Sequence, residues 1–222
     1  MNKDYTDNFL KGDTTVLKRD KAKQLQKLKQ ESAQFFKSVY KDQEKIMVFG
    51  EGNPYASLVL VGEAPGQQEV VQQRPFVGRA GKNLDEFLKI LDIKREDIYI
   101  TNAVKFRPVK IDPDTGRTSN RPPNREEIDL NRTVLYKELA IISPSIVVSL
   151  GNIPLRVLTD DNKLTIGQVH GRPLFISIGA KEQNMVLFPL YHPASIIYRP
   201  QLKDVYISDL QRLRKHLNKD NN

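Results

Sequence analysis

The sequence contains no cysteine and only three histidines, which limits the chemistry that the protein can carry out. Without cysteine, the chain forms no disulfide and holds no metal or cluster through thiolates. The histidines, His170, His192 and His216, are far apart in the sequence and argue against a structural zinc site. No apolar run reaches the ~18 residues of a membrane span, and the polar N-terminus lacks the apolar core of a signal peptide. We therefore expect a soluble, cytoplasmic protein that contacts no membrane and binds no metal.

The chain has an excess of positive charge. Its 35 lysines and arginines outnumber its 27 aspartates and glutamates, which gives a net charge of +8 over 222 residues. This excess favours a polyanion as the large partner, although a basic surface without such a partner is the alternative. The length suits a single domain with a substantial core. We expect that domain over residues 16–218, as a monomer, with disordered tails at residues 1–15 and 219–222.

Short apolar runs alternate with helical patterns along the chain. Helix patterns occupy residues 16–40, 84–91, 124–142, 154–158 and 202–217. Because strands that alternate with helices form parallel sheets covered on both faces, we expect an α/β fold, a three-layer α/β/α sandwich around a central four-stranded, mainly parallel sheet. The prolines and turn residues between Arg107 and Asn124 predict a long irregular loop. The predicted main strands are residues 58–61, 98–101, 146–150 and 186–189, with a small extra strand at 174–178.

Polar residues follow three of the predicted strands where each strand ends. Glu63 lies in the turn GEAPG after the first strand, Asn102 follows the second and His192 follows the fourth. The carboxyl ends of parallel strands meet at one edge of a sheet, where ligands bind in α/β proteins. The sequence therefore predicts a shared pocket at this edge.

Two glycine-rich stretches resemble nucleotide-binding motifs without matching them. A phosphate loop needs glycine five residues before Gly81 of GRAGKN, where this chain has Phe76, and serine or threonine after Lys82, where it has Asn83. The turn GEAPG is not a dinucleotide fingerprint, and no serine lies in a G-x-S-x-G elbow. These patterns exclude a nucleoside triphosphate site and leave a nucleophilic triad unsupported.

Four motifs, in order, carry a resemblance to a known family. GEAPGQQE, RPFVGRAG, TNAVKFRP and YHPAS stand at spacings that closely resemble the family 4 uracil-DNA glycosylases. The resemblance runs from about Phe49 through the terminal helix and implies the uracil-DNA glycosylase fold. It implies a monofunctional enzyme of base excision repair that flips uracil out of DNA and hydrolyses its N-glycosidic bond. The products would be free uracil and an abasic site.

The resemblance also implies roles for the residues of the GEAPGQQE turn. Glu63 and Ala64 would form the catalytic turn, whose backbone amides hold the uracil carbonyl and the adjoining sugar-phosphate. Glu69 would orient or deprotonate the attacking water. Glu63, Glu69 and His192 are therefore the predicted catalytic residues.

The remaining motifs supply the residues that would bind uracil and DNA. Phe76 would stack on the extruded base, Asn102 would read its Watson–Crick edge, and His192 would hydrogen-bond O2. Residues 196–199 either wedge into the gap in the base stack or pack the closing helix. The predicted DNA contacts are Gly66, Gly78, Arg79, Ser195, Tyr198 and Arg199.

This chain departs from the family in one respect. Typical members carry an iron–sulfur cluster on four cysteines, and this chain has none. Phe35, Ser38, Phe106 and Asn131 stand near the expected ligand positions, so the chain resembles a cluster-free branch in which apolar packing replaces the cluster. It also lacks the basic, histidine-containing insertion of relatives that become covalently trapped on DNA, so ordinary turnover is expected.

Two other functions remain open from the sequence. One is a protein that binds uracil-containing DNA without catalysis, which the absence of the cluster cysteines would suit. The other is a glycosylase for a different damaged base, since the sequence does not show whether a 5-methyl group is excluded.

Overall fold

The computed structural model describes residues 14–41, 45–178 and 183–219 and contains a six-stranded sheet in the order β1-β3-β2-β6-β8-β7. The four middle strands are mutually parallel, whereas β1 and β7 pair antiparallel at the two edges. The strands are β1 Glu51–Gly52, β2 Leu58–Gly62, β3 Tyr99–Asn102, β6 Ile146–Leu150, β7 Leu174–Ile178 and β8 Gln183–Leu190.

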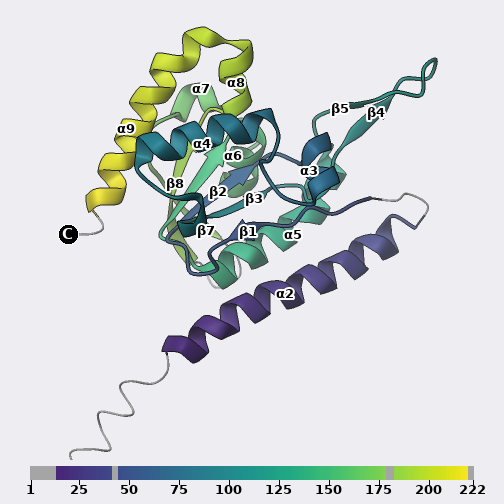
Figure 1. Cartoon of the computed structure of the whole chain (residues 1–222), viewed down its shortest axis with the longest axis horizontal. Coiled ribbons are helices and arrows are strands. Elements are labelled where there is room, and N and C mark those ends of the chain that lie inside the picture. The colour runs from purple at the N-terminus through teal and green to yellow at the C-terminus, as the bar shows by residue number, and fades with distance from the viewer. Residues whose placement is uncertain (1–13, 42–44, 179–182, 220–222) are drawn as a thin grey trace, which may run out of the picture.

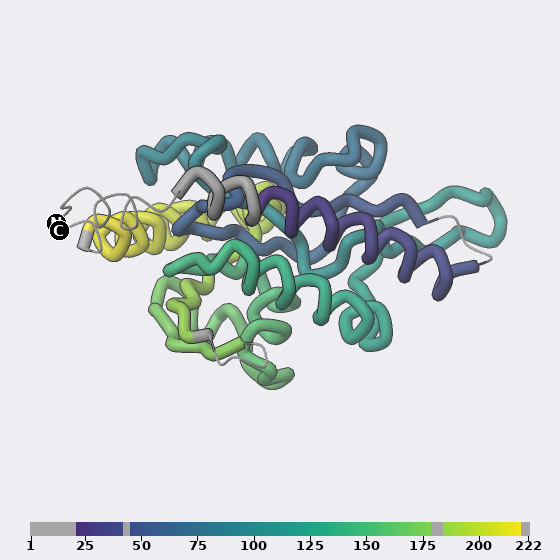
Figure 2. The backbone as a smooth tube through the Cα atoms, turned by 90° about the horizontal axis from the view of Figure 1, so that it is seen from below, coloured from purple at the N-terminus to yellow at the C-terminus, as the bar shows by residue number. Residues whose placement is uncertain are grey.

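Helices cover both faces of this sheet (Figures 1 and 2). They are α2 Thr14–Val39, α3 Gln67–Gln72, α4 Arg79–Leu91, α5 Arg125–Ile142, α6 Asn152–Thr159, α7 Ile166–Val169, α8 Pro193–Tyr198 and α9 Lys203–Lys219, with 3₁₀ turns at η1 Arg95–Asp97 and η2 Pro200–Leu202. The predicted three-layer α/β/α architecture is confirmed. The four predicted main strands form the parallel centre, the extra strand is β7, and β1 was not predicted.

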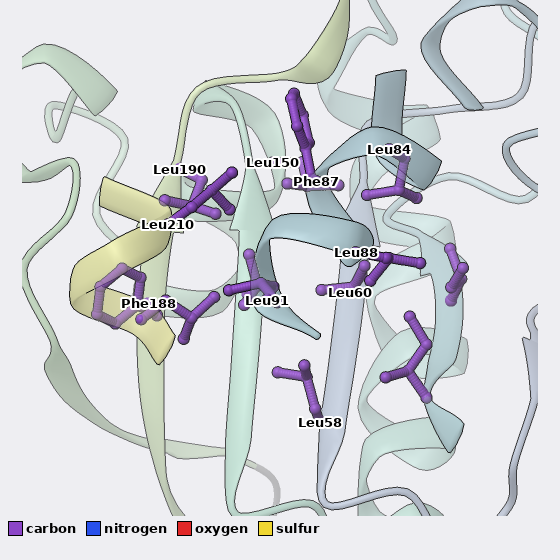
Figure 3. Close-up of a cluster of buried hydrophobic side chains, with 14 of the residues drawn as sticks. Leu58, Leu60, Leu84, Phe87, Leu88, Leu91, Leu150, Phe188, Leu190 and Leu210 are labelled. Atoms are coloured by element: carbon purple, nitrogen blue, oxygen red, sulfur yellow. The ribbon is translucent and has the colours of Figure 1, made fainter. Parts of the chain in front are cut away.

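Strand β2 shows why the sheet is buried on both faces. All five of its residues, LVLVG, are buried, as expected for a parallel strand between two helical layers. Leu58 and Leu60 face the layer of α4 and α9, and Val59 and Val61 face the layer of α5 and α6. Figure 3 shows the first of these clusters, in which Leu84, Phe87, Leu88 and Leu91 of α4 meet Phe188 and Leu210.

The predicted irregular loop between Arg107 and Asn124 is instead largely a β-hairpin. Strands β4, Val109–Ile111, and β5, Thr118–Asn120, pair antiparallel and project away from the sheet (Figure 1). The connection is a compact turn, because the Asp112 carboxylate accepts hydrogen bonds from the backbone N–H groups of Asp114 and Thr115. The prolines and turn residues therefore predicted the turn correctly, but they gave no indication of the two short strands.

Three short or terminal features complete the description. The helices α3 and α8, of six residues each, and α7, of four residues, were not predicted. The predicted tails fall mostly outside the described residues, which begin with α2 at Thr14 and end with α9 at Lys219. None of the described helices is long and apolar enough to cross a membrane.

Candidate active site

The carboxyl ends of β2 and β3 bring a glycine and an amide side by side. Gly62 pairs in register with Asn102, whose side chain is buried. A Cβ added to Gly62 would lie 2.4 Å from Asn102 Oδ1 and 2.6 Å from Cζ of Phe76, so the absence of a side chain lets the amide and the ring approach. The Asn102 amide makes no hydrogen bond to any described residue, which leaves both its donor and its acceptor for a ligand.

Phe76 is held in an unusual backbone conformation. Its φ of 52° is in the left-handed region, which bulky residues rarely adopt without support from their surroundings. Arg95 provides support by donating from Nη2 to the carbonyl oxygens of Pro75 and Phe76, at 2.8 and 3.1 Å. This conformation also requires glycine at position 81, since a Cβ on Gly81 would lie 1.9 Å from the Phe76 carbonyl oxygen. The buried ring is thus fixed at the floor of the site.

Glu69 is a buried carboxylate in the first turn of α3. Its Oε1 accepts hydrogen bonds from the backbone N–H groups of Val77 and Gly78, at 3.1 and 2.8 Å. Its Oε2 lies on the other side, 2.7 Å from the position of a Cβ on Gly66. One oxygen is therefore anchored by the protein, and the other faces the loop of the predicted catalytic turn.

His192 caps the N-terminus of α8 and lies across the site from Phe76. The two rings are 5.9 Å apart between centroids, with an angle of 30° between their planes. Nδ1 of His192 accepts a hydrogen bond from the N–H of Ala194 at 3.1 Å, so the proton of the neutral ring is on Nε2. Burial lowers the pKa of His192 to about 4. The histidine is therefore a neutral donor with a defined tautomer.

These side chains line a cavity of about 410 Å³, within the range for small-molecule sites. Eight of the predicted residues are here: Ala64, Gly66, Glu69, Phe76, Gly78, Arg79, Asn102 and His192. Residues that the sequence did not nominate also line it: Gln67, Gln68, Ala80, Asn120 and Ala194. Asn120 comes from the hairpin, which the sequence predicted as a long irregular loop. The length of that loop was the only sequence signal for a function in this segment, because long loops in compact domains are often functional.

The other predicted residues lie outside the cavity lining. Glu63 contributes its backbone to the turn, and burial of its side chain raises the pKa of its carboxyl group. Ser195, Tyr198 and Arg199 are on or just after α8, with Tyr198 78% exposed. Ile196 packs against the core, so this residue fits the packing alternative rather than the wedge.

A model of the uracil DNA glycosylase superfamily matches residues 49–214, most of the chain. This protein belongs to the uracil DNA glycosylase superfamily. It is 38% identical over 167 residues to a type-4 uracil-DNA glycosylase of Archaeoglobus fulgidus, covering 74% of this chain and 78% of the relative. A type-4 enzyme of Sulfurisphaera tokodaii is 36% identical over 170 residues, covering 75% and 72%. A DNA polymerase of Bacillus phage SP01 is 30% identical over 165 residues, covering 74% of this chain but 16% of the polymerase.

In this superfamily member, the residues near the expected cluster positions do not fit an iron–sulfur cluster. The chain offers no thiolate, and the buried Phe106 ring packs against Phe36 and Tyr40 at centroid distances of 6.3 and 5.2 Å. The ammonium group of Lys45 lies 4.4 Å from the centroid of the Phe106 ring. Phe36, Tyr40 and Phe106 thus form an aromatic group with the Lys45 cation above it.

The four predicted replacement positions behave differently from one another. Asn131 is buried, and its Oδ1 accepts from the N–H of Lys105 at 2.9 Å. Phe35 is 45% exposed and reaches the aromatic group only through Phe36. Ser38 is exposed and bonds the carbonyl of Phe35. Phe36 and Tyr40, rather than Phe35 and Ser38, therefore pack against Phe106.

Two further features of the described chain were compared with the candidate active site: a second hollow and possible metal ligands. A larger hollow of about 940 Å³ lies between α2 and α5, but it contains none of the predicted catalytic, uracil-binding or DNA-binding residues. Among the described residues, no three His, Asp or Glu side chains gather in a way that could hold a metal ion.

Proposed function

We infer that this protein is a uracil-DNA glycosylase that hydrolyses the N-glycosidic bond of an extruded deoxyuridine. The observation that carries the inference is the convergence of Phe76, Asn102, His192 and Glu69 on one cavity that is large enough to hold a base. An aromatic face, a side-chain amide, a neutral donor and a carboxylate are the groups that such a reaction needs. The match to the superfamily and to type-4 relatives supports the same reaction.

Asn102 and Phe76 suit recognition of the base. A ring stacked on uracil contributes dispersion energy and excludes water, but it does not contact the Watson–Crick edge of the base. The Asn102 amide can donate to O4 and accept from N3–H, so it distinguishes uracil from cytosine, which presents an amino group and a bare N3. Because Gly62 has no side chain, these two groups can both lie close to its backbone.

His192 and Glu69 suit the bond cleavage. As the C1′–N1 bond breaks, its electron pair passes to uracil and negative charge grows at O2. A neutral Nε2–H donor aimed at O2 stabilises that charge more than the ground state, typically by about 10²–10³ in rate. Water adds to C1′ of the cationic sugar, and the free oxygen of Glu69 accepts its proton.

The test is base release from a single-uracil oligonucleotide, read as alkali-induced strand cleavage in the presence of EDTA. Wild-type protein is expected to release uracil, and His192→Ala to lose about 10²–10³ of that rate. His216→Ala is the matched control, because His216 is on α9 outside the cavity. A folded, DNA-binding wild type that releases no base would refute the glycosylase function.

The similarity to a region of a phage DNA polymerase supports a second candidate. A domain of this kind could recognise uracil in DNA without cleaving the bond, as a reader beside a replicating enzyme. Tight binding of uracil-containing DNA with no base release would favour it. The presence of Glu69 and His192 in one cavity favours the enzyme.

We propose that the protein works without an iron–sulfur cluster, as a cytoplasmic monomer acting on uracil-containing DNA. Packing of Phe36, Tyr40 and Phe106 supports the first point, since these rings fill the space between α2 and the segment after β3. Light scattering at micromolar concentration checks the monomer. A concentration-independent dimer mass would refute it.

A further inference from the structure

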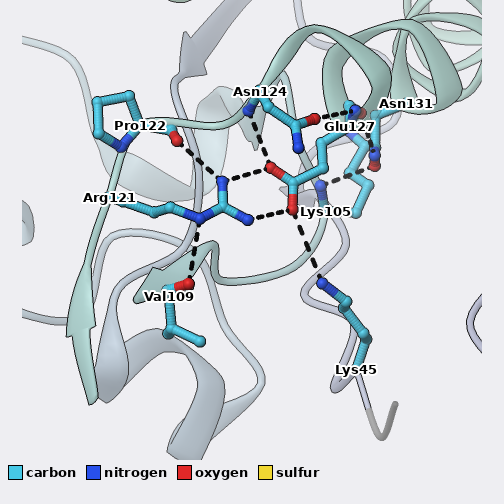
Figure 4. A network of polar contacts seen from close by, with 8 residues as sticks. All are labelled: Lys45, Lys105, Val109, Arg121, Pro122, Asn124, Glu127 and Asn131. Carbon is cyan, nitrogen blue, oxygen red and sulfur yellow. Dashed lines mark hydrogen bonds and ion pairs between the residues drawn. The ribbon is translucent and has the colours of Figure 1, made fainter. Parts of the chain in front are cut away.

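The β4–β5 hairpin is anchored at its base by a buried carboxylate (Figure 4). Arg121, directly after β5, donates from both terminal nitrogens to Glu127, at 2.7 Å each, and from Nε to the carbonyl of Val109 at 3.1 Å. Glu127 is buried and also caps α5 by accepting from the N–H of Asn124 at 2.9 Å. A bidentate pair of this kind is geometrically specific, so the residue before Arg121 is held in place.

That residue is Asn120, the only hairpin strand residue that lines the cavity in the described part of the chain. Its side-chain orientation is set by Arg107, whose Nε donates to Asn120 Oδ1 at 2.6 Å. The acceptor of the amide is therefore engaged, and its two N–H donors remain. The nitrogen is 3.8 Å from the position of a Cβ on Gly66, the same point that lies 2.7 Å from Glu69 Oε2.

Arg107 adds a positive charge to this wall of the cavity. Among the described residues, only its Nε has a hydrogen-bond partner, so its terminal nitrogens are available. A neutral donor and a guanidinium side by side match an anionic oxygen ligand. Around a flipped nucleotide, the anionic oxygens belong to the flanking phosphates, which face the outside of a pocket that encloses the base.

We propose that Asn120 and Arg107 form a phosphate-binding pair that holds the backbone next to the extruded nucleotide. Asn120 donates to a phosphate oxygen, and Arg107 both orients the Asn120 amide and neutralises the phosphate charge. The hairpin is thus a wall of the active site rather than a surface loop. The proposal rests on the function inferred above, but its test does not depend on catalysis.

The experiment measures the dissociation constant of an oligonucleotide that carries one tetrahydrofuran abasic-site analogue, by fluorescence anisotropy. Asn120→Ala is expected to weaken binding roughly tenfold or more, as for loss of a hydrogen bond to a charged group. Ser119→Ala is the matched control, since Ser119 points to the opposite face of the same exposed strand and is expected to bind as wild type.

Asn120→Asp separates a phosphate contact from a merely structural role. Aspartate keeps an oxygen that accepts from Arg107, so the hairpin stays supported, but it puts a negative charge in place of the donors. We expect it to bind more weakly than Asn120→Ala. Binding equal to wild type would overturn the proposal, as would an equal loss in Ser119→Ala.

The salt dependence of binding tests Arg107 independently. Loss of one phosphate contact lowers the slope of log K against log salt by about 0.9 on duplex DNA. Arg107→Gln, which retains a donor, is expected to show this reduction, and an unchanged slope would remove Arg107 from the phosphate contact. If the wild type binds the abasic-site oligonucleotide but releases no uracil from the single-uracil oligonucleotide, the enzyme inference fails while these comparisons still decide the role of the hairpin.

Discussion

The ammonium nitrogen of Lys105 lies 2.7 Å from the backbone carbonyl oxygen of Asn102, the residue whose amide faces the base pocket. Lys105 is fully buried, donates to Thr101 Oγ1 at 2.7 Å, and forms an ion pair with Glu138, which is also buried. Lys105 therefore holds the backbone of Asn102 in place. In this way a buried ion pair beneath the edge of the sheet supports the amide that recognises the base.

Replacement of Lys105 by methionine is expected to lower the free energy of unfolding by about 3–5 kcal/mol, because Glu138 is left buried without its partner. The double variant Lys105→Met with Glu138→Leu should recover much of that loss. Urea denaturation of the two single variants and the double variant gives the coupling. Additive losses in the double variant would show that the pair is not coupled.

Glu69→Gln is expected to slow base release by about 10²-fold or more while binding of DNA stays near that of wild type. Glutamine retains an oxygen for the N–H groups of Val77 and Gly78, so the loop geometry is preserved and only the charge is lost. Single-turnover kinetics at saturating enzyme measure the effect. Glu86→Gln, at an exposed position on α4, is the control, and an unchanged rate in Glu69→Gln would remove Glu69 from the chemical step.

The neutral state of His192 predicts the pH dependence of the reaction. Its pKa is lowered by burial from 6.5 to about 4, so the imidazole keeps its Nε2–H donor as the pH rises through 6.5. We expect no loss of the single-turnover rate with a midpoint near 6.5 on the alkaline side. Such a loss would show that the imidazolium form is required.

The lowered pKa of His192 also makes the stability of the fold depend on pH. Between pH 6.5 and about 4 the unfolded chain binds a proton at this position that the folded chain does not, so the contribution of His192 to stability is lost as the pH falls. Thermal unfolding of wild type and His192→Ala at pH 7 and pH 5 measures it. The variant should be less sensitive to acidification than the wild type.

Phe106→Ala is expected to lower the free energy of unfolding by about 3–5 kcal/mol, since it leaves a cavity between Phe36 and Tyr40. Phe35→Ala is the control, because Phe35 is 45% exposed and should cost much less. Purified wild type is expected to contain no iron by metal analysis. Stoichiometric iron, or equal losses from the two substitutions, would contradict aromatic packing in place of a cluster.

The parallel sheet and most of the pocket could be predicted because their signals are local. Apolar runs such as LVLVG are buried on both faces, and parallel strands deliver their last residues to one edge, which brings Asn102 and His192 to the same side. The motif order then supplied Glu69 and Phe76. These strands and site residues can be recognised from short stretches of sequence, without knowing which distant residues they contact.

Other parts depend on tertiary contacts that no local pattern contains. The strands around Asp112 are three residues each and mostly exposed, so they lack the alternation that marks a half-buried strand. Asn120 lines the cavity, and the residue after it, Arg121, is paired with Glu127 on α5, a contact between elements that no local pattern shows. Likewise, it is Phe36 and not its neighbour Phe35 that is buried on α2, where its ring packs against Phe106.

Gly62 limits how this pocket can vary by mutation. Every missense change in its codon adds a Cβ, and that atom would meet Asn102 Oδ1 and the Phe76 ring at contact distances that real structures do not tolerate. Drift at this one codon would therefore impair recognition of the base even where all four side chains that carry the chemistry are intact.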